Sequence, residues 1–220
     1  MHTILKNLNI LNTQIQDELK KNKNINKIPN IVAVSKTFPI EKIMPLIENN
    51  HIHFGENKVQ EAILKWTNIK QKYKNIKLHL VGKLQTNKVK FAVQLFDYIH
   101  SLDNLKLANK ISEIEKKLNK KTKIFIQVNI GNETQKNGID KKNVLEFYNT
   151  CKDLNLDIVG TMCIPPDDNK TEFYFEQMNE INNKLNLNEL SMGMSNDYLK
   201  AIHYSATFLR IGTNIFGKRN

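Results

Sequence analysis

Short apolar runs rich in β-branched residues alternate along the chain with longer segments in which apolar residues recur at helical spacing. The short runs predict eight strands, and the longer segments predict helices. The expected strands are 30–35, 51–54, 77–82, 97–102, 123–130, 157–162, 189–193 and 207–212. The expected helices are 40–49, 56–73, 87–95, 103–120, 140–153, 170–186 and 196–204, with one more amphipathic helix over 2–22. Because a strand–helix–strand crossover joins parallel strands, this order predicts a parallel sheet covered by helices.

Eight such units can close into a (β/α)8 barrel, whereas an open doubly wound sheet is the structural alternative. An open sheet of that kind normally carries a glycine-rich turn after its first strand. The first strand here runs into 33–37 (AVSKT), which contains no glycine. The 220 residues, of which 40% are hydrophobic, suit one domain. We therefore predict a single-domain (β/α)8 TIM barrel over 1–220 with an extra N-terminal helix.

The net charge of +11 raises the question of a nucleic-acid partner. Lysine, however, is abundant throughout, including the ordinary helical surface of 110–123, and the only arginines are Arg210 and Arg219. Aromatic residues are not interleaved with the basic ones as a base-stacking platform requires. We expect no nucleic-acid partner, and biased composition accounts for most of the charge.

Location follows from the same composition. No apolar run reaches the roughly 18 residues of a membrane span, and the first residues lack the pattern of a secretory signal. Cys151 and Cys163 form no paired motif, so two reduced thiols are expected rather than a disulfide or a zinc site. We therefore expect a cytoplasmic protein without a membrane partner.

Polar side chains gather where the predicted strands end, which is where barrels carry their chemistry. Strand alternation directs Lys36, His79 and Arg210 into the barrel, together with Gln127 and Asn129, while their apolar neighbours face the helices. Burying such groups without partners is costly, and a bound polar ligand is the simplest partner. The sequence therefore predicts a ligand pocket at this end of the barrel.

Lys36 ends a strongly apolar strand. Desolvation lowers the pKa of a lysine and frees its amine to attack a carbonyl, as a Schiff base requires. An ordinary exposed lysine at a strand end is equally consistent with the sequence, and the residues alone leave the two interpretations open.

A phosphate cradle is expected in the last two loops. Segment 191–195 (SMGMS) precedes a helix, and Gly212 and Thr213 follow the eighth strand. Barrels often bind phosphate in these two loops through backbone amides, and Ser195 and Thr213 add hydroxyls. Either segment alone would indicate only a tight turn, but both together favour phosphate.

Other polar residues have plainer interpretations. His51 and His53 alternate on one strand but lack a third ligand, so we predict structural histidines and no metal site. Glu56 stands at the start of a predicted helix, where it is expected to complement the helix dipole.

Together these features resemble the YggS-like pyridoxal phosphate homeostasis proteins, a PLP-binding family. The blocks that carry the resemblance are 33–37 (AVSKT), 54–61 (FGENKVQE), 79–88 (HLVGKLQTNK), 136–138 (KNG), 190–195 (LSMGMS) and 210–217 (RIGTNIFG). They follow one another over nearly the whole chain. The resemblance implies the barrel of the alanine racemase N-terminal domain and a protein that carries or regulates the cofactor, with effects on vitamin B6 and amino-acid balance and no established turnover.

The resemblance also implies roles for single residues. Lys36 would form a Schiff base with pyridoxal 5'-phosphate, and Arg210 would face the pyridine nitrogen. The other implied contacts are Asn57 beside the ring, Met194 and His79 along the pocket, and Ser195, Gly212 and Thr213 at the phosphate. The chain departs from the family at Lys58, often Tyr, and at Gln135, often Ser, which touches none of these positions. Lys136 is a second candidate site for the aldehyde.

Two features favour a carrier over a catalyst. Alanine racemases complete their site with a C-terminal β-domain and a tyrosine from the partner chain, and we expect neither here because the chain ends after its eighth strand. An arginine at the pyridine nitrogen also keeps that nitrogen unprotonated, which makes the ring a poor electron sink. We therefore expect a monomeric carrier that is not an enzyme, with apo forms of PLP-dependent enzymes as candidate recipients.

The alternatives are enzymes on the same barrel. One is a PLP-dependent racemase-like enzyme, and the other is an aldolase that uses Lys36 on a phosphorylated sugar. Either needs a second acid/base near the lysine, and no inward Glu, Asp or Tyr stands out in the sequence.

Overall fold

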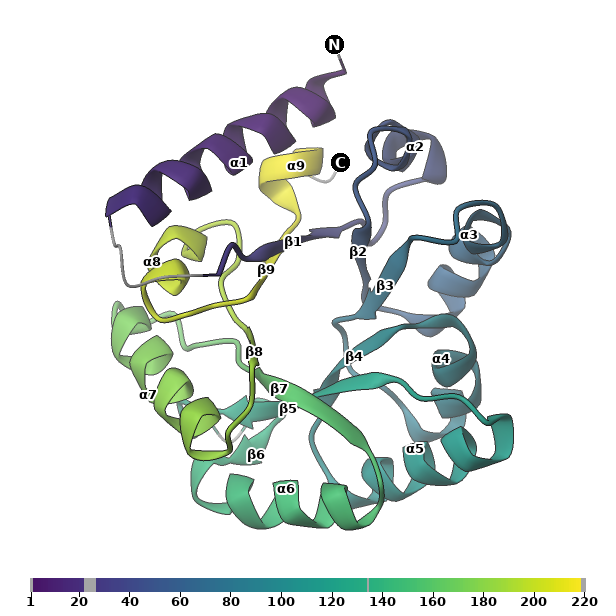
Figure 1. Cartoon of the computed structure of the whole chain (residues 1–220), viewed down its shortest axis with the longest axis vertical. Helices are drawn as coiled ribbons and strands as arrows, with labels where there is room; N and C mark the ends of the chain where they lie inside the picture. The colour runs from purple at the N-terminus through teal and green to yellow at the C-terminus, as the bar shows by residue number, and fades with distance from the viewer. Residues whose placement is uncertain (1, 22–26, 134, 219–220) are drawn as a thin grey trace.

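The computed structural model describes residues 2–21, 27–133 and 135–218. Parallel strands close into a barrel inside a ring of helices, so the predicted (β/α)8 barrel with an extra N-terminal helix is confirmed (Figure 1). The strands are β1 Asn30–Val34, β2 His53–Glu56, β3 Lys77–Leu80, β4 Tyr98–Leu102, β5 Lys123–Asn129, β7 Asp157–Met162, β8 Glu189–Ser191 and β9 Phe208–Ile211. Pairing runs from β1 through β2, β3, β4, β5, β7, β8 and β9 back to β1.

Helices connect consecutive strands of the barrel. They are α2 Ile40–Glu48, α3 Val59–Lys72, α4 Val89–Leu95, α5 Leu105–Leu118, α6 Val144–Asp153, α7 Thr171–Lys184 and α8 Tyr198–His203. Two more helices flank the barrel strands in the chain: α1 Thr3–Lys21 precedes β1, and α9 Thr213–Phe216 follows β9. Short 3-10 turns, η1 Thr86–Lys88 and η2 Lys141–Asn143, precede α4 and α6. No helix in the described part of the chain is long and apolar enough to cross a membrane.

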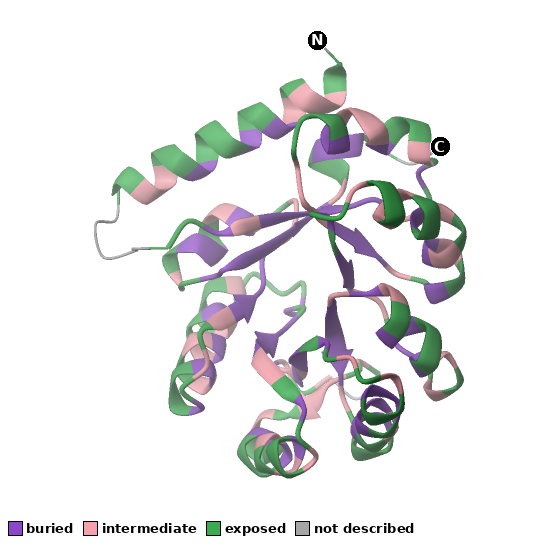
Figure 2. Ribbon diagram, turned by 45° about the vertical axis from the view of Figure 1, so that its right-hand side comes forward, coloured by how far each residue is buried: buried purple, intermediate pink, exposed green. Residues whose placement is uncertain are grey.

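Two apolar layers follow from strand alternation. Outward side chains such as Ala33, Leu78 and Leu209 pack under the helices, and the helices bury their inner faces against them (Figure 2). Inward side chains form a separate cluster inside the barrel, made of Val32, Tyr98, Phe125, Met162 and Phe208. The predicted assignment of faces on the strands is confirmed.

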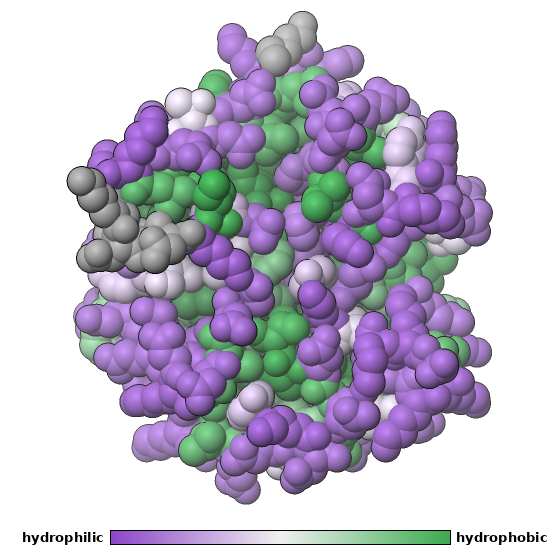
Figure 3. Space-filling model, viewed as in Figure 1, coloured by the Kyte–Doolittle hydropathy of each residue, from purple (hydrophilic) through white to green (hydrophobic). Residues whose placement is uncertain are grey.

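The surface is mostly hydrophilic around the edge of the molecule, with apolar side chains nearer the centre of the face shown in Figure 3.

The extra helix α1 lies across the last two helices, α8 and α9 (Figure 1). The Tyr198 hydroxyl donates to the Gln14 side chain, and the Asn7 amide donates to the carbonyl of Ile215. Buried Leu8, Leu11 and Ile15 form its apolar face. This contact holds α9, and with it the loop after β9.

The structure differs from the prediction around β2 and β5. The second strand was expected over 51–54, but it begins at His53 and runs to Glu56, whose Cα pairs with that of Leu80. The third helix consequently begins at Val59 rather than at 56. A further two-residue strand, β6 Ile139–Asp140, pairs with the end of β5 and was not predicted. Its brevity gives no alternation to read.

Candidate functional site

A cavity of about 720 Å³ opens at the carboxyl ends of the strands. Seven of the eight sequence-predicted site residues line it, namely Lys36, Asn57, Met194, Ser195, Arg210, Gly212 and Thr213. They come from the ends of β1, β2, β8 and β9, which lie far apart in the sequence and adjacent in the barrel. The site is thus assembled by closure of the barrel.

Lys36 follows β1 and is half-buried at the cavity. Both of its neighbours in the chain are held from the helix side. The Ser35 hydroxyl donates to the buried Glu56 carboxylate at 2.8 Å, and the Thr37 amide donates to Glu61 at 2.6 Å. The backbone on either side of Lys36 is therefore fixed by groups outside the cavity.

Thr37 has a φ of 68°, in the left-handed region. A β-branched residue is strained there, and strain of this kind persists where surrounding contacts over-determine the backbone. The contact from its amide to Glu61 is one of these constraints. The turn redirects the chain directly after Lys36.

Asn57 is held by close backbone packing. A Cβ atom at Gly82, the residue two beyond β3, would collide with the carbonyl oxygen of Asn57, so only glycine permits this approach. The approach keeps the start of the β2–α3 loop against the loop after β3 and so fixes Asn57 at the cavity wall.

The loops after β8 and β9 are joined to each other at the cavity. Gly193 has a φ of 87°, and the Asn214 amide donates to the carbonyl of Ser195 at 3.0 Å. Gly212 precedes the first residue of α9. Backbone amides in the first turn of a helix have no partner within that helix and can serve an acceptor. With the hydroxyls of Ser195 and Thr213, this junction is suited to an anion.

Arg210 is the buried cation of the cavity, with 6% of its surface exposed. Nη1 donates to the Ser191 hydroxyl at 2.7 Å, and Nη2 donates to the carbonyl of Cys163 at 2.8 Å. These two bonds fix the plane of the guanidinium. An arginine side chain has five N–H donors, so donors remain for a ligand acceptor.

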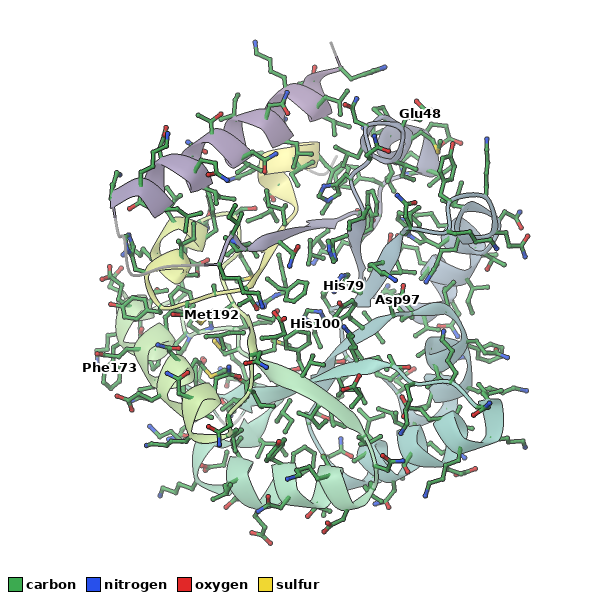
Figure 4. The ribbon with its side chains drawn as sticks, viewed as in Figure 1. Glu48, His79, Asp97, His100, Phe173 and Met192 are labelled. Carbon is green, nitrogen blue, oxygen red and sulfur yellow. The ribbon has the colours of Figure 1, made fainter. Side chains whose placement is uncertain are left out.

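His79 does not line the cavity, and the expectation that it does is not met. It lies within the barrel on β3, with no exposed surface, where its two ring nitrogens contact His53 and His100 at 2.9 Å (Figure 4). Burial, reinforced by the neighbouring histidines, holds the pKa of His79 well below its usual range. Its partners are other side chains, so it supplies no argument for a ligand.

Gln127 and Asn129 are also absent from the lining of the cavity. The Gln127 amide donates to the carbonyl of Asn137, and Asn129 exchanges hydrogen bonds with the backbone of Glu133. Both serve the turn after β5. Of the five polar groups expected to converge, the cavity brings together Lys36 and Arg210.

Sequence reasoning missed two carboxylates at the cavity, Asp167 and Asp197. Asp197 accepts the Met194 amide at 2.6 Å, which shapes the turn before α8. Asp167 lies in the loop after β7, which carried no signal beyond its two prolines. Lys136 also lines the cavity and pairs with Glu133. Two carboxylates that the sequence did not single out therefore line the same cavity as Lys36.

Glu56 does not complement a helix dipole as expected. It ends β2, is fully buried, and accepts hydrogen bonds from Ser35, Lys65 and Trp66. His51 contacts the carbonyl of His53. Among the described residues, no group of three His, Cys, Asp or Glu is placed to hold a metal ion.

Comparisons with known proteins bear on this site. A family model described as the alanine racemase N-terminal domain matches residues 12–220. A pyridoxal phosphate homeostasis protein of Haemophilus influenzae is 34% identical over 97% of this chain and 95% of its own length. The chain belongs to the pyridoxal phosphate homeostasis protein family. Another member, from Aquifex aeolicus, is 36% identical over 86% of each chain.

Solved structures agree with membership of the pyridoxal phosphate homeostasis protein family. The structure of PipY of Synechococcus elongatus with PLP bound is 32% identical to this chain and has a TM-score of 0.84. The match covers 97% of this chain and 100% of the PipY chain. An alanine racemase of Clostridium difficile is 15% identical with a TM-score of 0.70, and 57% of it is covered. The racemase shares the fold alone. The resemblance stated from the sequence blocks is confirmed.

Proposed function

We propose that this chain binds pyridoxal 5'-phosphate as a Schiff base on Lys36, and carries or buffers the cofactor for vitamin B6 and amino-acid homeostasis. One observation carries the proposal: Lys36, Arg210 and the Ser195–Thr213 junction line a single cavity. An amine, a fixed guanidinium and an anion cradle match the aldehyde, the ring nitrogen and the phosphate of that cofactor. The family names and the PLP-bound PipY support it.

We assign the contacts as follows. Lys36 holds the aldehyde carbon, Arg210 donates to the pyridine nitrogen, and Asn57 lies beside the ring. Met194 lines the wall, and Ser195, Gly212 and Thr213 hold the phosphate. His79 is left out of these contacts, because it does not line the cavity and its ring hydrogen-bonds to His100 instead.

The cofactor, when bound, supplies an electrophilic ring, but the chain's own residues favour holding it over using it. If Arg210 donates a hydrogen bond to the ring nitrogen, that nitrogen stays unprotonated, and the pyridine ring accepts electrons less readily. Asp197 is engaged by the Met194 amide. We therefore propose a carrier that is not an enzyme.

Asp167 and Lys136 favour the alternative, because both reach the cavity and either could move a proton. A racemase-like enzyme or a Schiff-base aldolase would use one of them as its acid/base. Lys136 already pairs with Glu133 and contacts the carbonyl of Pro165, which argues for a structural role.

We place this carrier in the cytoplasm as a monomer, with apo forms of PLP-dependent enzymes as recipients. Its buried thiols, Cys151 and Cys163, are unpaired in the structure, in keeping with a reducing compartment.

A transfer experiment separates the two functions. The chain loaded with the cofactor is mixed with an apo-transaminase, and recovery of transaminase activity is followed beside a racemase assay of the loaded chain itself. The carrier predicts recovery and no racemisation, loss of recovery in Lys36→Ala, and full recovery with the exposed-surface control Lys110→Ala. Racemisation that survives repurification and is lost with Asp167→Asn would overturn the carrier.

A further inference from the structure

A continuous chain of hydrogen-bonding side chains crosses the barrel interior from the amino ends of the strands to Arg210. His53 Nδ1 contacts His79 Nε2, His79 Nδ1 contacts His100 Nε2, and His100 Nδ1 contacts the Ser191 hydroxyl, each at 2.9 Å. Ser191 in turn accepts from Arg210 Nη1 at 2.7 Å. The four members from β2, β3, β4 and β8 are called the histidine relay below. Figure 4 shows His79 and His100 at the centre of the barrel.

The relay is buried and its rings are clamped by aromatic side chains. His79 stacks on Tyr98 with ring centroids 4.2 Å apart, and His100 stacks on Phe125 at 4.3 Å. His79, His100 and Ser191 have no exposed surface. The ring nitrogens of the two histidines must therefore find hydrogen-bond partners within the relay. Burial holds the pKa of His79 and His100 well below the usual range, so both rings are neutral near pH 7.

The direction of the relay follows from its two ends. Arginine only donates, so the Ser191 oxygen accepts from Arg210. That oxygen could also accept a second bond, but its own buried proton needs an acceptor, and among the described residues the other hydrogen-bond contact of the hydroxyl is His100 Nδ1. The arrangement that satisfies the hydroxyl proton therefore has His100 Nδ1 accepting it. His100 therefore carries its proton on Nε2 and donates to His79 Nδ1. By the same reasoning His79 Nε2 donates to His53 Nδ1. The neutral ring of His53, which is half-buried, then carries its proton on Nε2.

We propose that Ser191, His100, His79 and His53 are positioning residues for Arg210, forming a relay of three Nε2–H histidines that fixes the guanidinium at the cavity. The relay itself is a property of the chain without ligand, whereas its effect on the cofactor rests on the proposed function. His53 stands at the amino end of β2, where its Cα pairs with that of Lys77, and so the support of Arg210 extends through the barrel to its opposite end.

The first test needs no cofactor and no variant. Long-range ¹H–¹⁵N spectra of the histidine rings at pH 7 report which ring nitrogen is protonated. We expect neutral Nε2–H forms for His53, His79 and His100. A cationic or Nδ1–H form at His79 or His100 would overturn the proposal.

A second test asks whether the two ends communicate. His53→Phe removes the acceptor of His79, and we expect the ring-nitrogen signals of His100 to shift, although His100 does not contact residue 53 by a hydrogen bond. The control is Tyr98→Phe, which keeps the stack on His79 and removes no hydrogen bond of the relay. Unchanged His100 signals in His53→Phe would contradict the relay.

A third test links the relay to ligand binding. Ser191→Ala removes one acceptor of the charged Arg210, and we expect release of pyridoxal 5'-phosphate to accelerate by about tenfold, the factor that corresponds to one lost charge-assisted hydrogen bond. Ser191→Thr retains the hydroxyl and should release at the rate of the unaltered chain. Equal release by Ser191→Ala would refute positioning. Failure of the unaltered chain to bind the cofactor, with the ring spectra as expected, would refute only the proposed function.

Discussion

Lys65 donates from Nζ to the backbone carbonyl of Ser35 at 3.0 Å, directly before Lys36 in the chain. The same ammonium contacts the Glu56 carboxylate at 2.9 Å and the Glu61 carboxylate at 3.1 Å. Glu61 also accepts the amide of Thr37. One ion cluster on the helix side, made of the buried Glu56 and Lys65 side chains and the half-buried Glu61, therefore holds both neighbours of the proposed cofactor lysine.

Lys65→Met should destabilise the fold strongly. It leaves the fully buried Glu56 without its cation, and breaking a buried pair in this way costs about 3–5 kcal/mol. Urea unfolding at pH 7 measures the loss. The control Lys110→Met breaks the exposed pair with Glu113 and should cost less than about 1 kcal/mol. Adding Glu56→Gln to Lys65→Met should restore part of the stability, and a double variant no better than the single one would contradict a charge-based cause.

Thr37→Gly should stabilise the fold slightly. The left-handed backbone at Thr37 costs a non-glycine residue about 1–2 kcal/mol, and glycine removes this cost. Glycine also makes the unfolded chain more flexible, which offsets about 0.5–1 kcal/mol of the gain. The net gain in unfolding free energy is therefore between about 0 and about 1.5 kcal/mol. Asn50→Gly is the matched control, because asparagine tolerates its φ of 61° well and less strain is available to relieve. A clear loss of stability in Thr37→Gly would show that the side chain, not the backbone, matters there.

Stability should fall as the pH is lowered from about 6.5 towards 4. Burial lowers the pKa of His51 and of His53 to about 4, and that of His79 and His100 well below 6.5. The unfolded chain therefore binds protons below pH 6.5 that the folded chain does not, and stability increases with pH across this window.

The fully buried pair gives the slope a magnitude. His79 and His100 each contribute up to about 1.4 kcal/mol per pH unit below 6.5, where the unfolded imidazole is protonated. Urea unfolding at pH 7, 6 and 5 measures how steeply the unfolding free energy changes with pH. His100→Phe removes one histidine that only the unfolded chain protonates, and it should reduce this slope by close to about 1.4 kcal/mol per pH unit. A slope that is unchanged in this variant would mean that His100 is protonated in the folded chain.

Native thiols should be unreactive. Burial raises the pKa of Cys151 and of Cys163 to about 12, so almost no thiolate forms at pH 8. Iodoacetamide labelling followed by mass spectrometry should find both unmodified until urea unfolds the chain. Rapid labelling of either residue without denaturant would contradict the buried environment.

Much of the fold was predictable because strand–helix alternation needs only local patterns. The inward and outward faces of β5, with Ile124 and Ile126 under the helices and Phe125 inside, follow from a period of two. β6 is too short for such a pattern, and the start of β2 depends on pairing with β3. Those features arise from contacts between strands and have no signature within either segment.

Site residues that lie on a sequence motif were predictable, whereas contacts between side chains of different strands inside the barrel were not. Lys36, Ser195 and Thr213 lie on recognisable segments and line the cavity. His79 was assigned to that lining because it faces inward, yet its partners His53 and His100 come from other strands. An inward position does not reveal depth along the barrel axis, and so only closure of the barrel shows that His79 lies beneath the pocket.

The most direct test of the central claim is to locate the covalent bond. The purified chain is incubated with pyridoxal 5'-phosphate, its visible spectrum is recorded, borohydride is added, and the modified peptide is identified by mass spectrometry. We predict a yellow protein that borohydride bleaches, label on Lys36, and a colourless Lys36→Ala. A colourless chain, or a label confined to Lys136 or surface lysines, would contradict a cofactor held by Lys36.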